Sequence, residues 1–155
     1  MNSSITNDHA AYLFQEMEQT LLAEHLTPKE QIPKLRSVLD LLFNFITQSA
    51  DLALSNTHGR MMFVQNNFAP PVEMMQALHR FRIFANKVVH ELSCIPDENE
   101  FRASLFILAE ATTFFSGVKE SEKIAELRIR FPNLQLEDEK TQAKERIGWL
   151  DAIVL

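Results

Sequence analysis

Residues 97–117 read DENEFRASLFILAEATTFFSG, and this stretch decides the fold class. Asp97 and Glu100 have the spacing of a capping box, which opens a helix, and Gly117 suits the left-handed position that ends one. Large apolar residues lie on most sides of the helix between them: Phe101, Leu105, Phe106, Leu108, Phe114 and Phe115. A helix with this pattern belongs at the centre of a bundle. The sequence therefore predicts a central helix over residues 98–116 of an all-α protein.

Three more helices are predicted before it, over residues 9–25, 33–55 and 72–92, because apolar residues recur there at three- and four-residue spacing. The second helix has two alternative starts. The Thr-Pro-Lys-Glu run at residues 27–30 is typical of a helix start, but Pro33 either kinks the helix or delays its start to residue 33. The helices predicted over residues 72–92 and 98–116 are expected to form an antiparallel hairpin that buries Phe81, Phe101, Leu105 and Phe115.

The composition favours long helices and excludes several kinds of site. The 155 residues include only three glycines, and tight turns, which favour glycine, are therefore few. A single cysteine, Cys94, excludes an internal disulfide and a multi-cysteine zinc site. The five histidines do not have the spacing of metal ligands. We therefore expect no metal and no other cofactor.

The net charge of −6 gives the chain no overall basic surface of the kind that nucleic-acid-binding proteins use. It leaves room only for a local basic strip. The first residues lack a basic start followed by an apolar run, and no apolar stretch approaches the roughly 20 residues of a membrane span. We therefore expect a cytoplasmic protein without a membrane partner.

Residues 58–71 are predicted to form a connection, since Gly59, the pair at 66–67 and the prolines at 70–71 interrupt the helical pattern. Five large apolar residues make this connection unusual: Met61, Met62, Phe63, Val64 and Phe68. Either it packs over the core or it presents an apolar surface to a partner. In the second case Met61, Met62 and Phe63 are candidate interface residues.

The composition changes after Gly117, and residues 119–146 are rich in Glu, Lys and Arg. Residues 121–128 predict a short helix that is broken at Pro132. The alternation of residues 126–131 favours a strand instead. Both alternatives remain open on the sequence.

The last nine residues, 147–155, are apolar. They form either a helix that packs back on the bundle or the first strand of a following domain. We therefore expect a helical bundle over residues 1–117. Residues 118–155 are expected to be a charged tail or the start of a following element.

One edge of the helix predicted over residues 72–92 combines four polar side chains. At about 100° per residue and with Leu78 as reference, Arg82 falls at about 40°, Asn86 at about 80°, His79 at about 100° and His90 at about 120°. Steps of three and four residues bring such neighbours into contact. Solvated faces usually mix Glu and Lys, so this edge indicates either polar contacts between helices or a binding surface.

Residues 78–91, LHRFRIFANKVVHE, resemble the signature helix of HEPN-like domains, closest to the branch found in type I restriction subunits and helicases. That branch has the pattern Leu-x-x-x-Arg-x-x-Gly-Asn-x-Ala-x-His. The matching positions are Leu78, Arg82, Asn86 and His90, whereas alanine and valine stand at positions 85 and 88 in place of the family's Gly and Ala.

The resemblance implies a HEPN-like bundle of four to five helices over about residues 8–117. It also implies a non-catalytic accessory domain of a prokaryotic nucleic-acid-processing or defence protein, N-terminal to a helicase or nuclease module. The implied partner is a second copy of the chain or another protein, and nucleic acid is reached through a larger assembly. The candidate binding or interface residues are those of the polar edge, His79, Arg82, Asn86 and His90, and the last three of them match the family's pattern.

HEPN ribonucleases pair an Arg with a His across a dimer, with four to six residues between the two in the sequence. The His serves acid–base chemistry and the Arg stabilises the phosphate. Counted back from His90, that Arg falls within residues 83–85, which are Ile, Phe and Ala. We therefore expect no catalytic residues. The alternatives are a metal-independent ribonuclease that uses His90 with Arg82 or Arg80, and a protein–protein adaptor that uses the apolar residues of 61–68.

Overall fold

A computed structural model gives the structure of the protein and describes residues 5–48, 50 and 56–137. Helices account for all the regular structure of this part of the chain, which contains no strand. They are α1 (Asn7–Leu22), α2 (Pro28–Ile46), α3 (Thr57–Phe68), α4 (Val72–His90), α5 (Glu98–Ser116) and α6 (Glu122–Arg130). The predicted all-α class is confirmed.

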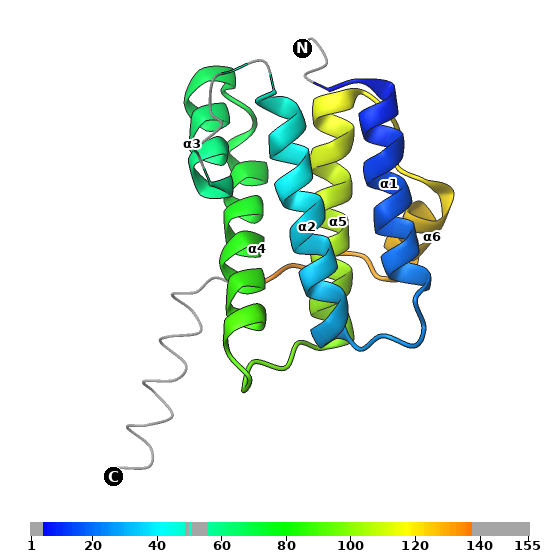
Figure 1. The fold of residues 1–155 in the computed structure, drawn as a ribbon. Coiled ribbons are helices and arrows are strands. Elements are labelled where there is room, and N and C mark those ends of the chain that lie inside the picture. Colours follow the sequence, from blue (N-terminus) through cyan, green and yellow to red (C-terminus); the bar gives the residue numbers. More distant parts are fainter. Residues whose placement is uncertain (1–4, 49, 51–55, 138–155) are drawn as a thin grey trace.

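Four of the helices form an antiparallel bundle (Figure 1). α1 and α4 run in one direction, α2 and α5 run in the other, and each of the first pair packs against both of the second. α3 packs on one end of α2, and α6 packs on α5. α5 contacts the other three bundle helices and α6, which confirms its predicted central position.

The ends of α5 follow the sequence prediction. Asp97 Oδ1 accepts a hydrogen bond from the Glu100 amide at 2.7 Å, and Glu100 Oε1 accepts one from the Asp97 amide at 3.0 Å. Gly117 ends the helix with a φ of 76°, a conformation that costs glycine little. The predicted hairpin of α4 and α5 buries its four aromatic and aliphatic residues completely or nearly so: Phe81, Phe101, Leu105 and Phe115.

α2 begins at Pro28, and Pro33 lies inside it. The prediction that the helix begins near residue 33 is therefore wrong. Glu30 Oε1 accepts hydrogen bonds from the amide and the hydroxyl of Thr27, at 3.2 and 3.0 Å. This cap and the buried face of the helix outweigh the backbone hydrogen bond that Pro33 cannot make. The helix ends at Ile46, short of the predicted residue 55.

α3 corrects the prediction that residues 58–71 are a loop. Asn56 caps the helix, since its Oδ1 accepts a hydrogen bond from the Gly59 amide at 2.8 Å. Met61 and Val64 are fully buried, one turn apart. Burial of this short stripe against α2 outweighs the weak helix propensity of the polar residues around it. The helix ends at Ala69, whose φ is 44°.

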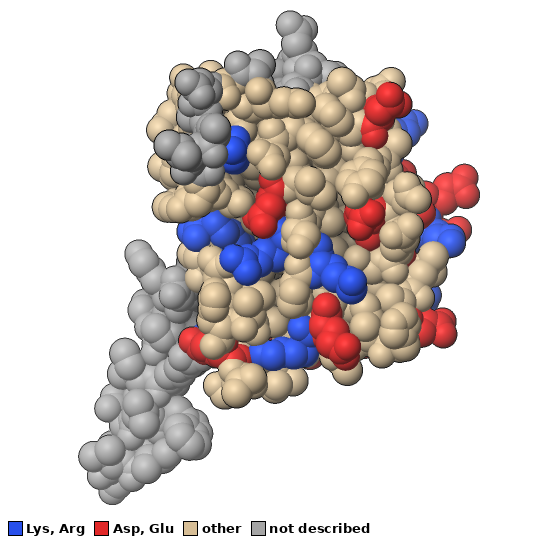
Figure 2. Space-filling view, viewed as in Figure 1, with Lys and Arg blue, Asp and Glu red and all other residues tan. Residues whose placement is uncertain are grey.

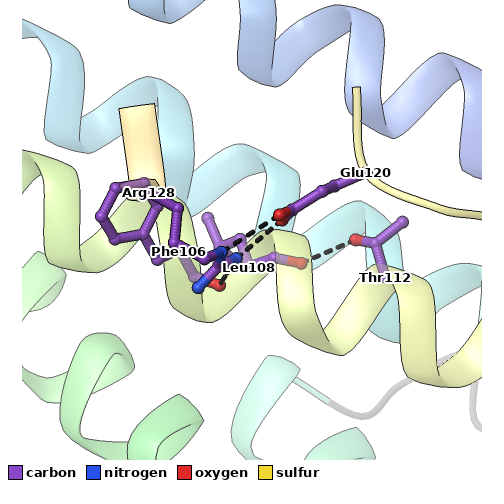
Figure 3. A network of polar contacts seen from close by, with 5 residues as sticks. All are labelled: Phe106, Leu108, Thr112, Glu120 and Arg128. Carbon is purple, nitrogen blue, oxygen red and sulfur yellow. Dashed lines mark hydrogen bonds and ion pairs between the residues drawn. The ribbon is translucent and has the colours of Figure 1, made fainter. Parts of the chain in front are cut away.

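A polar network joins α6 to α5 (Figure 3). The guanidinium of Arg128 donates to both carboxylate oxygens of Glu120, at 2.7 and 3.1 Å, and to the Phe106 carbonyl at 3.4 Å. Ile124 of α6 is fully buried beneath this network. The helix prediction for this segment is thus confirmed and the strand alternative is wrong. Residues 147–155, with their two alternatives, lie outside the described residues.

Candidate functional site

The polar edge of α4 lies where this helix meets α3 and α2. His79, Arg82 and Asn86 are half-buried, whereas His90 is exposed and is the last residue of the helix. Eight residues separate Arg82 from His90, which corresponds to about 12 Å along the axis. Within one chain the edge therefore brings His79 and Arg82 together and leaves His90 apart from them.

His79 connects α4 to α3. Its Nε2 lies 3.0 Å from Gln65 Oε1, and its ring meets the ring of His58 edge-on, with centroids 5.7 Å apart. Burial lowers the pKa of His79, and the charges of Arg82 and His58 lower it further. A neutral imidazole can donate to the Gln65 carbonyl oxygen while avoiding the nearby cation. This side chain is therefore a neutral contact between helices at pH 7.

Arg82 is a cation in a partly desolvated position. Its Nε is buried without a hydrogen-bond partner within residues 5–48, 50 and 56–137, and burial lowers the pKa of its guanidinium. Asn86, one turn further on, makes no side-chain hydrogen bond in the same part of the chain. Two hydrogen-bonding side chains of this edge are therefore available for a ligand.

The apolar candidates of α3 divide between core and surface. Met61 is fully buried, Phe63 is half-buried and Met62 is 36% exposed. Phe68, 44% exposed, meets the ring of Phe63 edge-on at 6.3 Å. Met61 therefore belongs to the core, and Met62 and Phe68 form the accessible part of the group.

Lys29 holds the end of α4 and was missed at the sequence level. Its Nζ donates hydrogen bonds of 2.7 Å to the carbonyl oxygens of Val88, Glu91 and Cys94. An ammonium group at this place satisfies carbonyls that the helix end leaves free and complements the helix dipole. No local pattern could reveal the contact, because its partners lie 59 to 65 residues away.

The other side of α4 lines a groove of about 780 Å³ between α4, α5 and residues 131–136. Arg80 and Arg128 line it together with Glu73 and Glu110, so its charges are balanced. Arg80 is thus separated from the edge that carries Arg82. Within the described ranges there is no cluster of His, Cys, Asp and Glu suited to a metal ion, and no helix long and apolar enough to cross a membrane.

Lys and Arg side chains gather in a band across the face formed by α4 and α2 (Figure 2). α2 carries Lys29, Lys34 and Arg36, and α4 carries Arg82 and Lys87, whereas Arg80 of α4 lines the groove on its other side. Acidic side chains lie above and below the band on the same face. This is the local basic strip for which the net charge left room.

Comparisons of the chain with protein-family models, with curated proteins and with solved structures found no match. The features of the chain that bear on function are therefore the α4 edge and residues 78–91.

Proposed function

We propose that this chain is a non-catalytic, HEPN-like helical interaction domain of a prokaryotic nucleic-acid-processing or defence protein. The antiparallel bundle is compatible with a HEPN-like fold, and all four matching positions lie on α4, where Leu78 is fully buried in the core. The domain would act by binding, either to a second copy or to another protein of the same assembly.

Residues 83–85 of α4 support the non-catalytic reading above all, because an arginine that acts with His90 across a dimer is expected there and the residues are Ile, Phe and Ala. His90 is exposed at the last residue of α4, about 12 Å along the helix from Arg82. The nearer histidine, His79, is engaged with Gln65 and has a lowered pKa because it is buried. Neither histidine is placed beside Arg82 as a free acid–base group in the same chain.

Incubation of the chain with structured and single-stranded RNAs in the presence of a chelator tests this proposal. We expect no cleavage above that of a matched His90→Ala variant. Cleavage that His90→Ala and Arg82→Ala both abolish would establish the ribonuclease alternative instead. His25→Ala, which alters an exposed histidine after α1, is the control for contaminating nuclease.

A protein–protein adaptor is the second candidate, and exposed apolar side chains favour it. Met62 in the middle of α3 is 36% exposed, and Phe68 and Val72, on either side of the turn between α3 and α4, are 44% and 70% exposed. Such side chains are typical of a contact surface when they lie together. The two candidates differ in the partner, which is a second copy or a protein of a nucleic-acid-processing assembly in the first and any protein in the second.

A further inference from the structure

The register between α2 and α4 places Arg36 at the level of Arg82. Lys29 lies beside the end of α4, where it contacts the carbonyls of Val88 and Glu91. The two helices are antiparallel (Figure 1). Arg36 is two turns further along α2, and Arg82 lies about two turns back along α4 from that end. The two arginines are therefore at the same height in the bundle.

Arg36 also lies on the side of α2 that faces α3 and α4. Lys29, Arg36, Asp40 and Thr47 follow one another at steps of seven, four and seven residues, so they share one stripe of the helix. The outer members of this stripe contact α3 or α4. Asp40 Oδ1 accepts a hydrogen bond of 2.6 Å from the Thr57 hydroxyl of α3. The Thr47 hydroxyl oxygen accepts one of 2.7 Å from the Arg60 guanidinium of the same helix. Arg36 lies between Lys29, which contacts α4, and Asp40, which contacts α3.

Arg82 reaches the seam between α2 and α4 from the α4 side. It shares an edge with His79, one turn earlier, and His79 contacts α3. The α3-facing edges of α2 and α4 thus each carry one arginine at the same height. Packed helices are separated by about 8–10 Å, so two arginine side chains can reach one group placed between them.

Neither guanidinium is neutralised within the described part of the chain. The ion pair found there joins Arg128 to Glu120 on the opposite side of the bundle. Arg36 and Arg82 donate no hydrogen bond to the residues described, and Arg82 Nε is buried without an acceptor. A partly buried cation without a counter-charge is unfavourable. The lowered pKa of Arg82 has the same cause, namely burial. An anionic group in the seam would relieve this cost.

The surroundings favour a carboxylate over a nucleic-acid backbone. The net charge of −6 opposes the approach of a long polyanion. Asp40 lies one turn above Arg36, while Glu30 and Glu91 lie near Lys29 at the other end of the band. Nucleic acids gain their affinity from many phosphate contacts, whereas a carboxylate can take a bidentate contact from a single guanidinium.

We propose that the seam between α2 and α4, with Arg36 and Arg82 as its cationic contacts, is a docking site for a short acidic peptide segment of a protein partner. This rests on the proposed function, because it names the kind of partner that the α4 edge binds. A Glu or Asp side chain of the segment lies between the two guanidinium groups, and Asn86 supplies a further hydrogen-bond donor beside them.

Titration of the intact chain with a capped hexapeptide that carries a single glutamate tests the site, with the Nε–H signals of the arginines followed by NMR. We expect the signals of Arg36 and Arg82 to shift and those of Arg128 and Arg130 to stay. Arg36→Gln and Arg82→Gln should each weaken binding by about tenfold or more. Lys123→Gln, an exposed position of α6, removes the same charge outside the seam and should leave the affinity unchanged.

Folding of the variants is checked by thermal unfolding. Because Arg82→Gln removes a desolvated charge, its midpoint should equal or exceed that of the wild type, and Arg36→Gln provides a second variant at a half-buried position. Unchanged Arg36 and Arg82 signals at saturating peptide would overturn the proposal. A hexathymidylate that shifts these signals at lower concentration than the peptide would also overturn it, in favour of nucleic acid.

The same samples separate this proposal from the proposed function. His90-dependent cleavage of RNA defeats the proposed function whatever the peptide does. Absence of both cleavage and peptide binding defeats only the acidic-peptide site.

Discussion

His79 illustrates how one residue changes its chemistry when a neighbouring helix covers it. In a free α4 it would be an ordinary surface histidine, but α3 brings Gln65 within 3.0 Å of its Nε2 and removes water from its ring. The same helix divides two adjacent methionines, because Met61 faces the core and Met62 faces outward. Both consequences can be measured one residue at a time.

Acidification should destabilise the chain through His79. Its folded pKa is lowered below the ordinary value of 6.5, so between the two values the unfolded state binds more protons. The unfolding free energy is therefore highest above pH 6.5 and falls as the pH drops toward the folded pKa. Urea unfolding at about pH 7.5 and about pH 5.5 should show a smaller loss for His79→Gln than for wild type. An equal loss in both proteins would exclude His79 as the cause.

Met61 and Met62 form a matched pair for testing the placement of α3. Met61→Ala should cost about 2–5 kcal/mol, the usual range for a fully buried methionine. Met62→Ala should cost less than about 1 kcal/mol, since this side chain is 36% exposed. Chemical denaturation of the two variants measures both values. Equal costs would mean that α3 is rotated from the position described.

At the scale of elements, the ends of helices are fixed by contacts of different range. α5 is capped by its own neighbours in sequence, Asp97 and Glu100. α4, by contrast, ends against a side chain from α2, since Lys29 takes three of its terminal and following carbonyls. The relative position of α2 and α4 thus depends on the ammonium group of Lys29.

Lys29→Met should loosen the end of α4 while keeping the apolar stem of the side chain. Hydrogen bonds from a charged donor contribute about 1.5–3 kcal/mol each at most, so we expect a total loss of roughly 2–3 kcal/mol after water replaces part of them. Hydrogen exchange should accelerate in the last turn of α4 and stay unchanged in α1. Lys34→Met, at an exposed position of the same helix, is the control and should have little effect. Uniform acceleration throughout the bundle would contradict a local role.

At the scale of the whole molecule, the bundle leaves two kinds of surface beside one another. The basic band crosses α2 and α4 (Figure 2), and exposed apolar side chains lie on α3 (Met62) and beside the turn between α3 and α4 (Phe68 and Val72). Partner interfaces commonly combine an apolar centre with a polar rim. A contact surface that includes both would use the α3–α4 side of the molecule.

Self-association through this side stays a prediction. We expect the chain to sediment as a dimer at tens of micromolar and Phe68→Ser to shift it toward monomer, because Phe68 is 44% exposed. Tyr12→Ser removes an aromatic side chain of similar exposure from α1 and is the matched control. Analytical ultracentrifugation distinguishes the species. A wild-type monomer at high micromolar concentration would rule out the dimer and leave a heterologous partner for this surface.

Residues close together in sequence determined the all-α class, the bounds of α5 and the buried faces of α4 and α5. Caps such as Asp97 with Glu100, and apolar spacing of three and four residues, act over one or two turns and can therefore be read directly from the sequence. α3 also has local signals, an Asn56 cap and the one-turn spacing of Met61 and Val64, but Gly59 and the pair at 66–67, which are typical of connections, obscured them.

Tertiary structure alone decided the surroundings of the α4 edge. The lowered pKa of His79, the anchoring of α4 by Lys29 and the shared height of Arg36 and Arg82 all arise where segments distant in sequence pack together. Helical periodicity places a side chain on a face of its own helix and contains no information on what the neighbouring helix brings to that face. Burial and register, which set charge state and proximity, are properties of the packed bundle.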